Sequence, residues 1–179
     1  MEEYTKAMLT PYPLQQYGPN EFFFTSNYGN TYEIGFYPYW QKDLMPMYTD
    51  FDLNLFEIYF EVVETKYKGR DRRIPFTLMN TIAEFVSVDD RIGFFVIQRE
   101  DGRSKQLLKV YNLWFQQYEQ VKGETGLMTN RVVSMDGEIA SYLSCVLHHN
   151  NSLLKSTSPD ELLNQVLKEI YPFCELDTF

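Results

Sequence analysis

The chain has 179 residues, of which 44% are hydrophobic and 23% charged, a balance that excludes a disordered tail and a collagen-like or coiled-coil rod. Its formal net charge of -9 argues against non-specific nucleic-acid binding, because that binding depends on neutralising phosphates. No apolar run approaches the roughly 20 residues of a membrane-spanning helix, and no secretory signal opens the sequence. We therefore expect a cytoplasmic protein with no membrane partner.

Aromatic and β-branched residues dominate the first part of the chain. Residues 21–28 and 31–40 predict a β-hairpin, because two such runs flank Gly29-Asn30, a pair that favours a tight turn. Residues 54–65 predict a third strand, since large apolar residues there alternate with glutamates and tyrosines. Each of these strands is expected to bury one face and to leave the other in water.

The middle of the chain alternates between helical and extended patterns. Pro75 stands where a helix can begin, and apolar residues at helical spacing extend the prediction over 75–86. Residues 92–97 are almost wholly apolar, which is typical of a central strand covered on both faces. An apolar stripe over 104–121 predicts a second, amphipathic helix.

The C-terminal third contains one ambiguous segment. Residues 127–134 predict a strand, whereas residues 138–148 fit the period of a strand and of a helix equally well. The Asp136-Gly137 pair between them favours a hairpin, so we predict a strand. The stretch Ser158 to Glu161 has the composition of a capping box and predicts the start of a last helix.

The predicted order is β-β-β-α-β-α-β-β-α. Hairpins early and late, with helices between them, indicate an α+β two-layer domain with an antiparallel or mixed sheet and three helices mainly on one side. We expect residues 21–179 to form this single domain. Residues 1–20 are expected to form an N-terminal extension, whose apolar side chains can dock on the domain or on a neighbour.

Some of these residues also follow the pattern of a known family. The pattern comprises Phe24-Thr25, Gly29, Tyr32, Phe36, Leu78, Ile82, Phe85, Asp101-Gly102-Arg103, Tyr111, Trp114 and Phe115. The sequence thereby resembles a small bacterial domain family of unknown function over about residues 20–150, and most specifically over 78–115. The resemblance implies the fold and a bacterial or phage setting, and it implies no activity.

The residue types of catalytic and metal sites are scarce. Cys145 and His149 lie roughly 13 Å apart if their segment is a strand, too far for a proton relay, and His148 then points to the other face. Only a helix would bring Cys145 and His149 within one turn. Cys145 and Cys174 are expected to be reduced thiols, and no metal-ligand spacing is present. We therefore predict no catalytic residue, no metal and no cofactor.

The acidic pairs have structural explanations. Asp50 and Asp52, like Asp89 and Asp90, lie beside predicted turns, where aspartate bonds to the local backbone. The loop after the 92–97 strand has a single glycine and two acids, which argues against an acyl-CoA pyrophosphate loop at that place.

Basic residues are concentrated in one stretch. Residues 66–109 contain ten Lys or Arg against six Asp or Glu, although the whole chain is acidic. If the two middle helices pack side by side, the basic residues can form one patch that binds an anion or an acidic partner. The residues of this predicted patch are Arg70, Arg72, Arg73, Arg99, Arg103, Lys105 and Lys109.

A second candidate surface is aromatic. Bulky apolar residues continue past the hairpin into a proline-broken stretch, a composition typical of protein interfaces: Tyr37, Tyr39, Trp40, Met45, Met47 and Tyr48. The leading hypothesis is a non-enzymatic protein-interaction module of a bacterial or phage system, such as a defence or toxin–antitoxin system, that binds another protein or itself. The alternative is a small-ligand-binding protein or enzyme that recognises an anion such as a nucleotide through the basic patch.

Overall fold

The computed structural model describes residues 10–39, 54–97, 102–123, 126–170 and 174–178. The strands are β1 (Gln15–Gly18), β2 (Glu21–Thr25), β3 (Thr31–Pro38), β4 (Leu55–Glu64), β5 (Ile92–Ile97), β6 (Gly126–Met135), β7 (Glu138–His148) and β8 (Glu175–Thr178). The helices are α1 (Arg73–Val86), α2 (Ser104–Lys122) and α3 (Pro159–Ile170), with a short 3₁₀ helix, η2 (Ser152–Lys155). These elements confirm the predicted α+β class.

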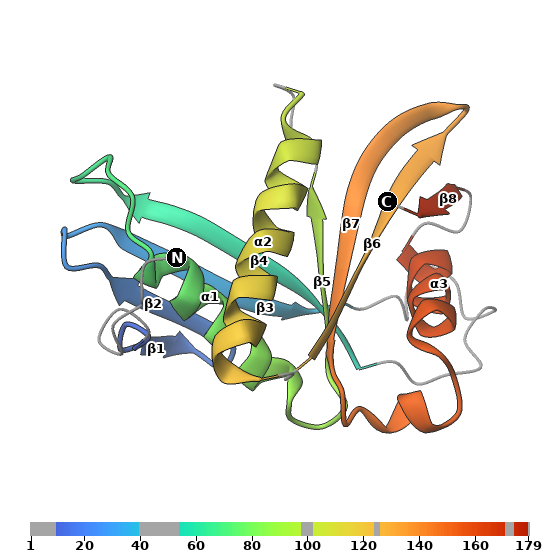
Figure 1. Ribbon diagram of the computed structural model, residues 1–179, viewed down its shortest axis with the longest axis horizontal. Helices are drawn as coiled ribbons and strands as arrows, with labels where there is room; N and C mark the ends of the chain where they lie inside the picture. Colours follow the sequence, from blue (N-terminus) through green and yellow to red (C-terminus); the bar gives the residue numbers. More distant parts are fainter. Residues whose placement is uncertain (1–9, 40–53, 98–101, 124–125, 171–173, 179) are drawn as a thin grey trace.

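The described strands form one mixed sheet in the order β1-β2-β3-β4-β5-β7-β6-β8. Strands β1 to β4 are an antiparallel meander, and β5, β7, β6 and β8 are also antiparallel. The two halves meet where β4 and β5 run parallel, with α1 as the crossover between them. Figure 1 shows β4 and β5 diverging from this meeting point, with α1 and α2 in front of the sheet.

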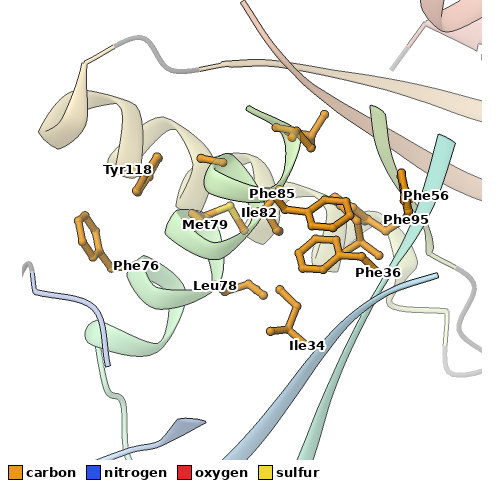
Figure 2. Packing of buried hydrophobic residues seen from close by; sticks show 14 of the residues in the cluster. Ile34, Phe36, Phe56, Phe76, Leu78, Met79, Ile82, Phe85, Phe95 and Tyr118 are labelled. Atoms are coloured by element: carbon orange, nitrogen blue, oxygen red, sulfur yellow. The ribbon is translucent and has the colours of Figure 1, made fainter. Parts of the chain in front are cut away.

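The larger core lies between the sheet and the helices α1 and α2. The even-numbered residues of β3 and β4 face it, as the alternation of their sequences predicts, and Ile34 and Phe36 are fully buried there. The ring of Phe36 stacks on that of Phe85 from α1, with centroids 3.8 Å apart. Figure 2 shows this contact beside Phe56 and Phe95. The core therefore joins the two halves of the sheet through α1.

A second core lies on the opposite face of the sheet, under α3. Alternation along β5 sends Phe94 to this side and Phe95 to the other, which is why the 92–97 run has no polar position. Leu163 and Leu167 of α3 are fully buried against it. The sheet consequently has helices on both faces over β5, β7 and β6, whereas the prediction of two layers describes the β1–β4 half.

Two local predictions are confirmed. Residues 138–148 form strand β7, which pairs with β5 as well as with β6, so tertiary pairing settles the helix–strand ambiguity. The capping box is present at α3: the N–H of Ser158 donates to the Glu161 carboxylate at 3.0 Å, and the N–H of Glu161 donates to the Ser158 hydroxyl at 3.2 Å.

Residues 10–18 are part of the folded body. Tyr12 is 4% exposed, its N–H donates to Thr77 Oγ1 of α1 at 2.9 Å, and its ring stacks on Phe24. The Arg73 guanidinium lies 3.8 Å from the centre of the Tyr12 ring and donates to the carbonyl of Thr10 at 2.9 Å. Arg73 is thus a clamp that holds this segment onto α1.

Replacing Arg73 with alanine should lower the free energy of unfolding by about 2 kcal/mol, because two hydrogen bonds to backbone carbonyls and a cation–π contact are lost. Urea denaturation monitored by circular dichroism measures this. Arg70→Ala is the matched control, since Arg70 is exposed and lies three residues away. Equal losses of stability in the two variants would contradict the clamp.

Candidate functional site

The pairing between β4 and β5 is short, and it leaves a V-shaped gap in the sheet. The two strands pair only over Leu55–Glu57 and Ile92–Phe94. Within the described part of the chain, residues 58–64 and 95–97 pair only on their far sides, with β3 and β7. Beyond the vertex, the edge of each strand that faces the gap therefore pairs with no other described strand.

A glycine permits the close approach at the vertex. Gly93 pairs with Phe56, and a Cβ atom at position 93 would lie 2.7 Å from Cδ1 of Ile58 and 3.4 Å from Val86. Strands β4 and β5 and helix α1 come together at Gly93 because this residue has no side chain. The residues after it on β5 and after Phe56 on β4 have larger side chains. The gap begins after Glu57 and Phe94, one residue beyond this glycine.

A cavity of about 220 Å³ occupies the gap. Its inner wall is apolar and includes Leu78 and Ile82 of α1 and Leu107 of α2. Glu57 and Tyr59, whose side chains are on the opposite face of β4, also line it. The cavity therefore lies between β4, β5, α1 and α2, with an apolar wall on the side of the helices.

Basic side chains flank the open end of the gap. The loop after β4 has exposed Lys66, Lys68, Arg70 and Arg72, while the start of α2, which follows β5, has exposed Arg103, Lys105 and Lys109. Because β4 and β5 are parallel, their carboxyl ends open toward the same end of the gap. Figure 1 shows the carboxyl ends of β4 and β5 pointing apart. Arg73 is used by the clamp on Tyr12, and Arg99 lies outside the described residues.

The loop after β4 is held in place by Asn30. The Asn30 side-chain oxygen accepts hydrogen bonds from the N–H groups of Lys66 and Tyr67 at 2.7 and 2.8 Å, and its amide nitrogen donates to the Tyr67 carbonyl at 2.8 Å. Asn30 is 4% exposed, so these bonds are shielded from water. The β2–β3 turn therefore positions the basic loop.

Side chains, and not the α1 helix terminus, provide the positive charge of this loop. The Asp71 carboxylate already accepts a bond from the N–H of Arg73 at 3.0 Å, and Pro75 has no N–H to offer. An anion at this end of the gap would be bound by ammonium and guanidinium groups.

The predicted aromatic surface divides between two environments. Tyr37 is 41% exposed on β3, whereas Tyr39 packs edge-on against Phe94 at 5.3 Å, in the core under α3. Trp40, Met45, Met47 and Tyr48 lie outside the described residues.

Cys145 has the environment of a core residue. It is fully buried in β7, and this burial raises the pKa of its thiol to about 12. The ring of His148 packs on that of His149 with centroids 4.3 Å apart, and burial, followed by the neighbouring His149, lowers the pKa of His148. A neutral thiol within the core is not a nucleophile.

The Asp89-Asp90 pair has a structural role. Asp90 accepts bonds from the N–H and the hydroxyl of Ser152, and its carbonyl accepts one from the Asn151 side chain at 3.0 Å. These bonds tie the α1–β5 turn to η2, and the two from Ser152 lower the pKa of the Asp90 carboxyl. Asp50 and Asp52 lie outside the described residues.

No group of His, Cys, Asp and Glu side chains among the described residues is arranged to hold a metal ion. Within the same residues, no helix is long and apolar enough to cross a membrane. Comparison with protein-family models, curated proteins and solved structures found no match to this chain.

Because only the thiolate reacts with iodoacetamide, we expect the folded protein at pH 8 to be alkylated at the partly exposed Cys174 and to leave Cys145 unmodified. Mass spectrometry of tryptic peptides locates the label. Unfolding in guanidinium chloride should make both thiols react and serves as the control. Labelling of Cys145 at the rate of Cys174 in the folded protein would contradict a buried neutral thiol.

Proposed function

We propose that this protein binds a phosphate-bearing ligand with an extended, amide-containing arm, the class of the coenzyme A thioesters, in the gap between β4 and β5. The observation that carries the proposal is the pair of unpaired strand edges that line an apolar cavity. This is the small-ligand alternative of the sequence analysis, with the site placed between two strands.

The arm of such a ligand suits the unpaired edges. Backbone N–H and C=O groups need partners wherever water is excluded, and an extended chain with amide groups can supply them in the manner of an added strand. The edge of β4 from Ile58 to Glu64 is about 20 Å long. An elongated arm fits this length better than a compact ring does.

The surroundings of the gap differ in polarity, as the two ends of such a ligand do. Phosphates would lie at the open end, where Lys68 and Arg70 are exposed. An acyl group would lie against the apolar wall that Leu78 and Ile82 of α1 form.

The position of Glu57 among the lining residues also supports acyl transfer as the reaction class. A second substrate would meet the thioester carbonyl beside this carboxylate. An attacking amine would form the new C–N bond, its proton would pass to the Glu57 carboxylate, and the C–S bond would break to release the thiolate, which takes that proton back to become the thiol.

A second candidate is the non-enzymatic interaction module, a cytoplasmic protein of a bacterial or phage system that acts by binding another protein or itself. The observation that favours it is aromatic surface in water: Tyr17 is 83% exposed and Tyr37 41% exposed, both on the face of the sheet that α1 and α2 do not cover. Exposed aromatic groups of this kind are typical of protein interfaces.

Acetyl-coenzyme A at 100 times its dissociation constant should raise the melting temperature by about 5–10 °C, since binding to the folded state alone stabilises it. Leu107→Trp fills the cavity from α2 and should abolish this shift. Leu113→Trp is the matched control on the same helix, because Leu113 is 51% exposed and does not line the cavity. Differential scanning fluorimetry measures both, and no shift of the wild-type protein at millimolar ligand would sink the proposal.

Reversing the charges of Lys68 and Arg70 to glutamate should weaken coenzyme A binding at least tenfold in isothermal titration calorimetry, through lost contacts to phosphate. Lys155→Glu with Lys168→Glu makes the same change in net charge on η2 and α3 and should change affinity less than twofold. Equal weakening in both double variants would contradict a phosphate site at the loop.

A further inference from the structure

One face of the β2–β4 meander combines carboxylates with aromatic rings. Strand alternation turns the odd-numbered residues of these strands away from α1 and α2. We call this surface the outer face and define it by Glu21, Phe23, Glu33, Tyr37, Tyr59 and Glu61. Within the described part of the chain, α3 covers the equivalent face only over the β5–β7–β6 half, so the outer face has no helix over it.

Among the described residues, the outer face concentrates negative charge without a Lys or Arg of its own. Strands β1 to β4 contain no Lys or Arg in their described residues. Glu33 and Glu61 are direct cross-strand partners in the β3–β4 register. Like charges opposite each other destabilise a sheet, so this pair weakens the fold that carries it. A positively charged partner would relieve that repulsion.

The rings of the outer face are fixed by their neighbours. The Tyr37 ring lies over Gly35, where an added Cβ atom would come within 3.1 Å of it, and its hydroxyl donates to Glu21 at 3.2 Å. Tyr59 lies 6.3 Å from Tyr37, centroid to centroid. Rigid aromatic faces beside carboxylates suit guanidinium and ammonium groups, which bind both through cation–π contacts and charged hydrogen bonds.

We propose that the outer face docks an arginine- and lysine-rich segment of a partner protein. The proposal rests on the second candidate function and names the chemistry of that partner. A second copy of this chain is a poorer occupant, because two molecules of net charge -9 repel each other. Charge complementarity sets the orientation and the rate of association, while the rings supply the apolar contact.

The test uses a fluorescein-labelled twelve-residue peptide of alternating Arg and Gly and fluorescence anisotropy at 150 mM salt. Glu33→Gln with Glu61→Gln should weaken binding at least tenfold. Asp136→Asn with Glu138→Gln removes the same charge from the exposed β6–β7 turn and should change affinity less than twofold. Tyr37→Ala should weaken binding, whereas Tyr37→Phe, which keeps the ring, should retain most of it.

The melting temperature separates a loss of binding from a loss of folding. The double variant Glu33→Gln with Glu61→Gln removes a like-charge pair, so its melting temperature should rise by roughly 1–3 °C. The same variant should keep the thermal shift with acetyl-coenzyme A, so the two proposals can fail separately. Equal weakening by the turn variant, or absence of peptide binding, would overturn the docking proposal. Sedimentation could also show that the wild-type chain is a dimer and that the double variant Glu33→Gln with Glu61→Gln is a monomer. This result would overturn the docking proposal, because the occupant of the outer face would then be a second copy of the chain.

Discussion

The architecture depends on one short parallel contact, the pairing of Leu55–Glu57 with Ile92–Phe94. Parallel strands need a crossover connection, and α1 makes it while burying Phe85 between the two halves of the sheet. The glycine at position 93 allows the strands and α1 to meet, because a Cβ atom there would lie 2.7 Å from Cδ1 of Ile58. A continuous sheet would have no cavity at this place, so the proposed ligand site exists because the pairing stops early.

Although the chain is acidic overall, acidic and basic side chains are concentrated on different surfaces of the molecule. Carboxylates lie on the outer face of β2 to β4, in strands without Lys or Arg, while seven exposed basic residues lie in the segments that follow β4 and β5: Lys66, Lys68, Arg70, Arg72, Arg103, Lys105 and Lys109. The two proposed sites thus differ in the sign of their charge and lie at different places on the molecule. Both sites include β4, since Glu57 and Tyr59 line the cavity while Tyr59 and Glu61 belong to the outer face.

The sequence indicates which residues are candidates for a site, but it does not fix what each of them does in the folded protein. It marked Arg73 as an anion-binding residue, but its guanidinium is used to hold Tyr12 and the carbonyl of Thr10, a contact between residues 61 to 63 positions apart that no local pattern encodes. The basic residues beside the gap can be predicted from the sequence, but the gap itself cannot. No pattern in the residues of β4 and β5 indicates that the two strands pair in parallel over only three residues each. Asn30 was read as a turn residue, and its bonds to the loop after β4 appeared only in the structure.

What the sequence by itself determined was local: the hairpin arms, the apolar strand at 92–97, the amphipathic helix α2 and the capping box of α3, because each rests on periodicity or on bonds between near neighbours. The short edge strands β1 and β8 escaped it, since four residues carry too little pattern to be recognised. Only the tertiary structure decided that 138–148 is a strand, that α3 covers the face opposite α1 and α2, and that β4 and β5 separate. Those outcomes depend on which distant surfaces bury one another, a choice that the whole chain makes together.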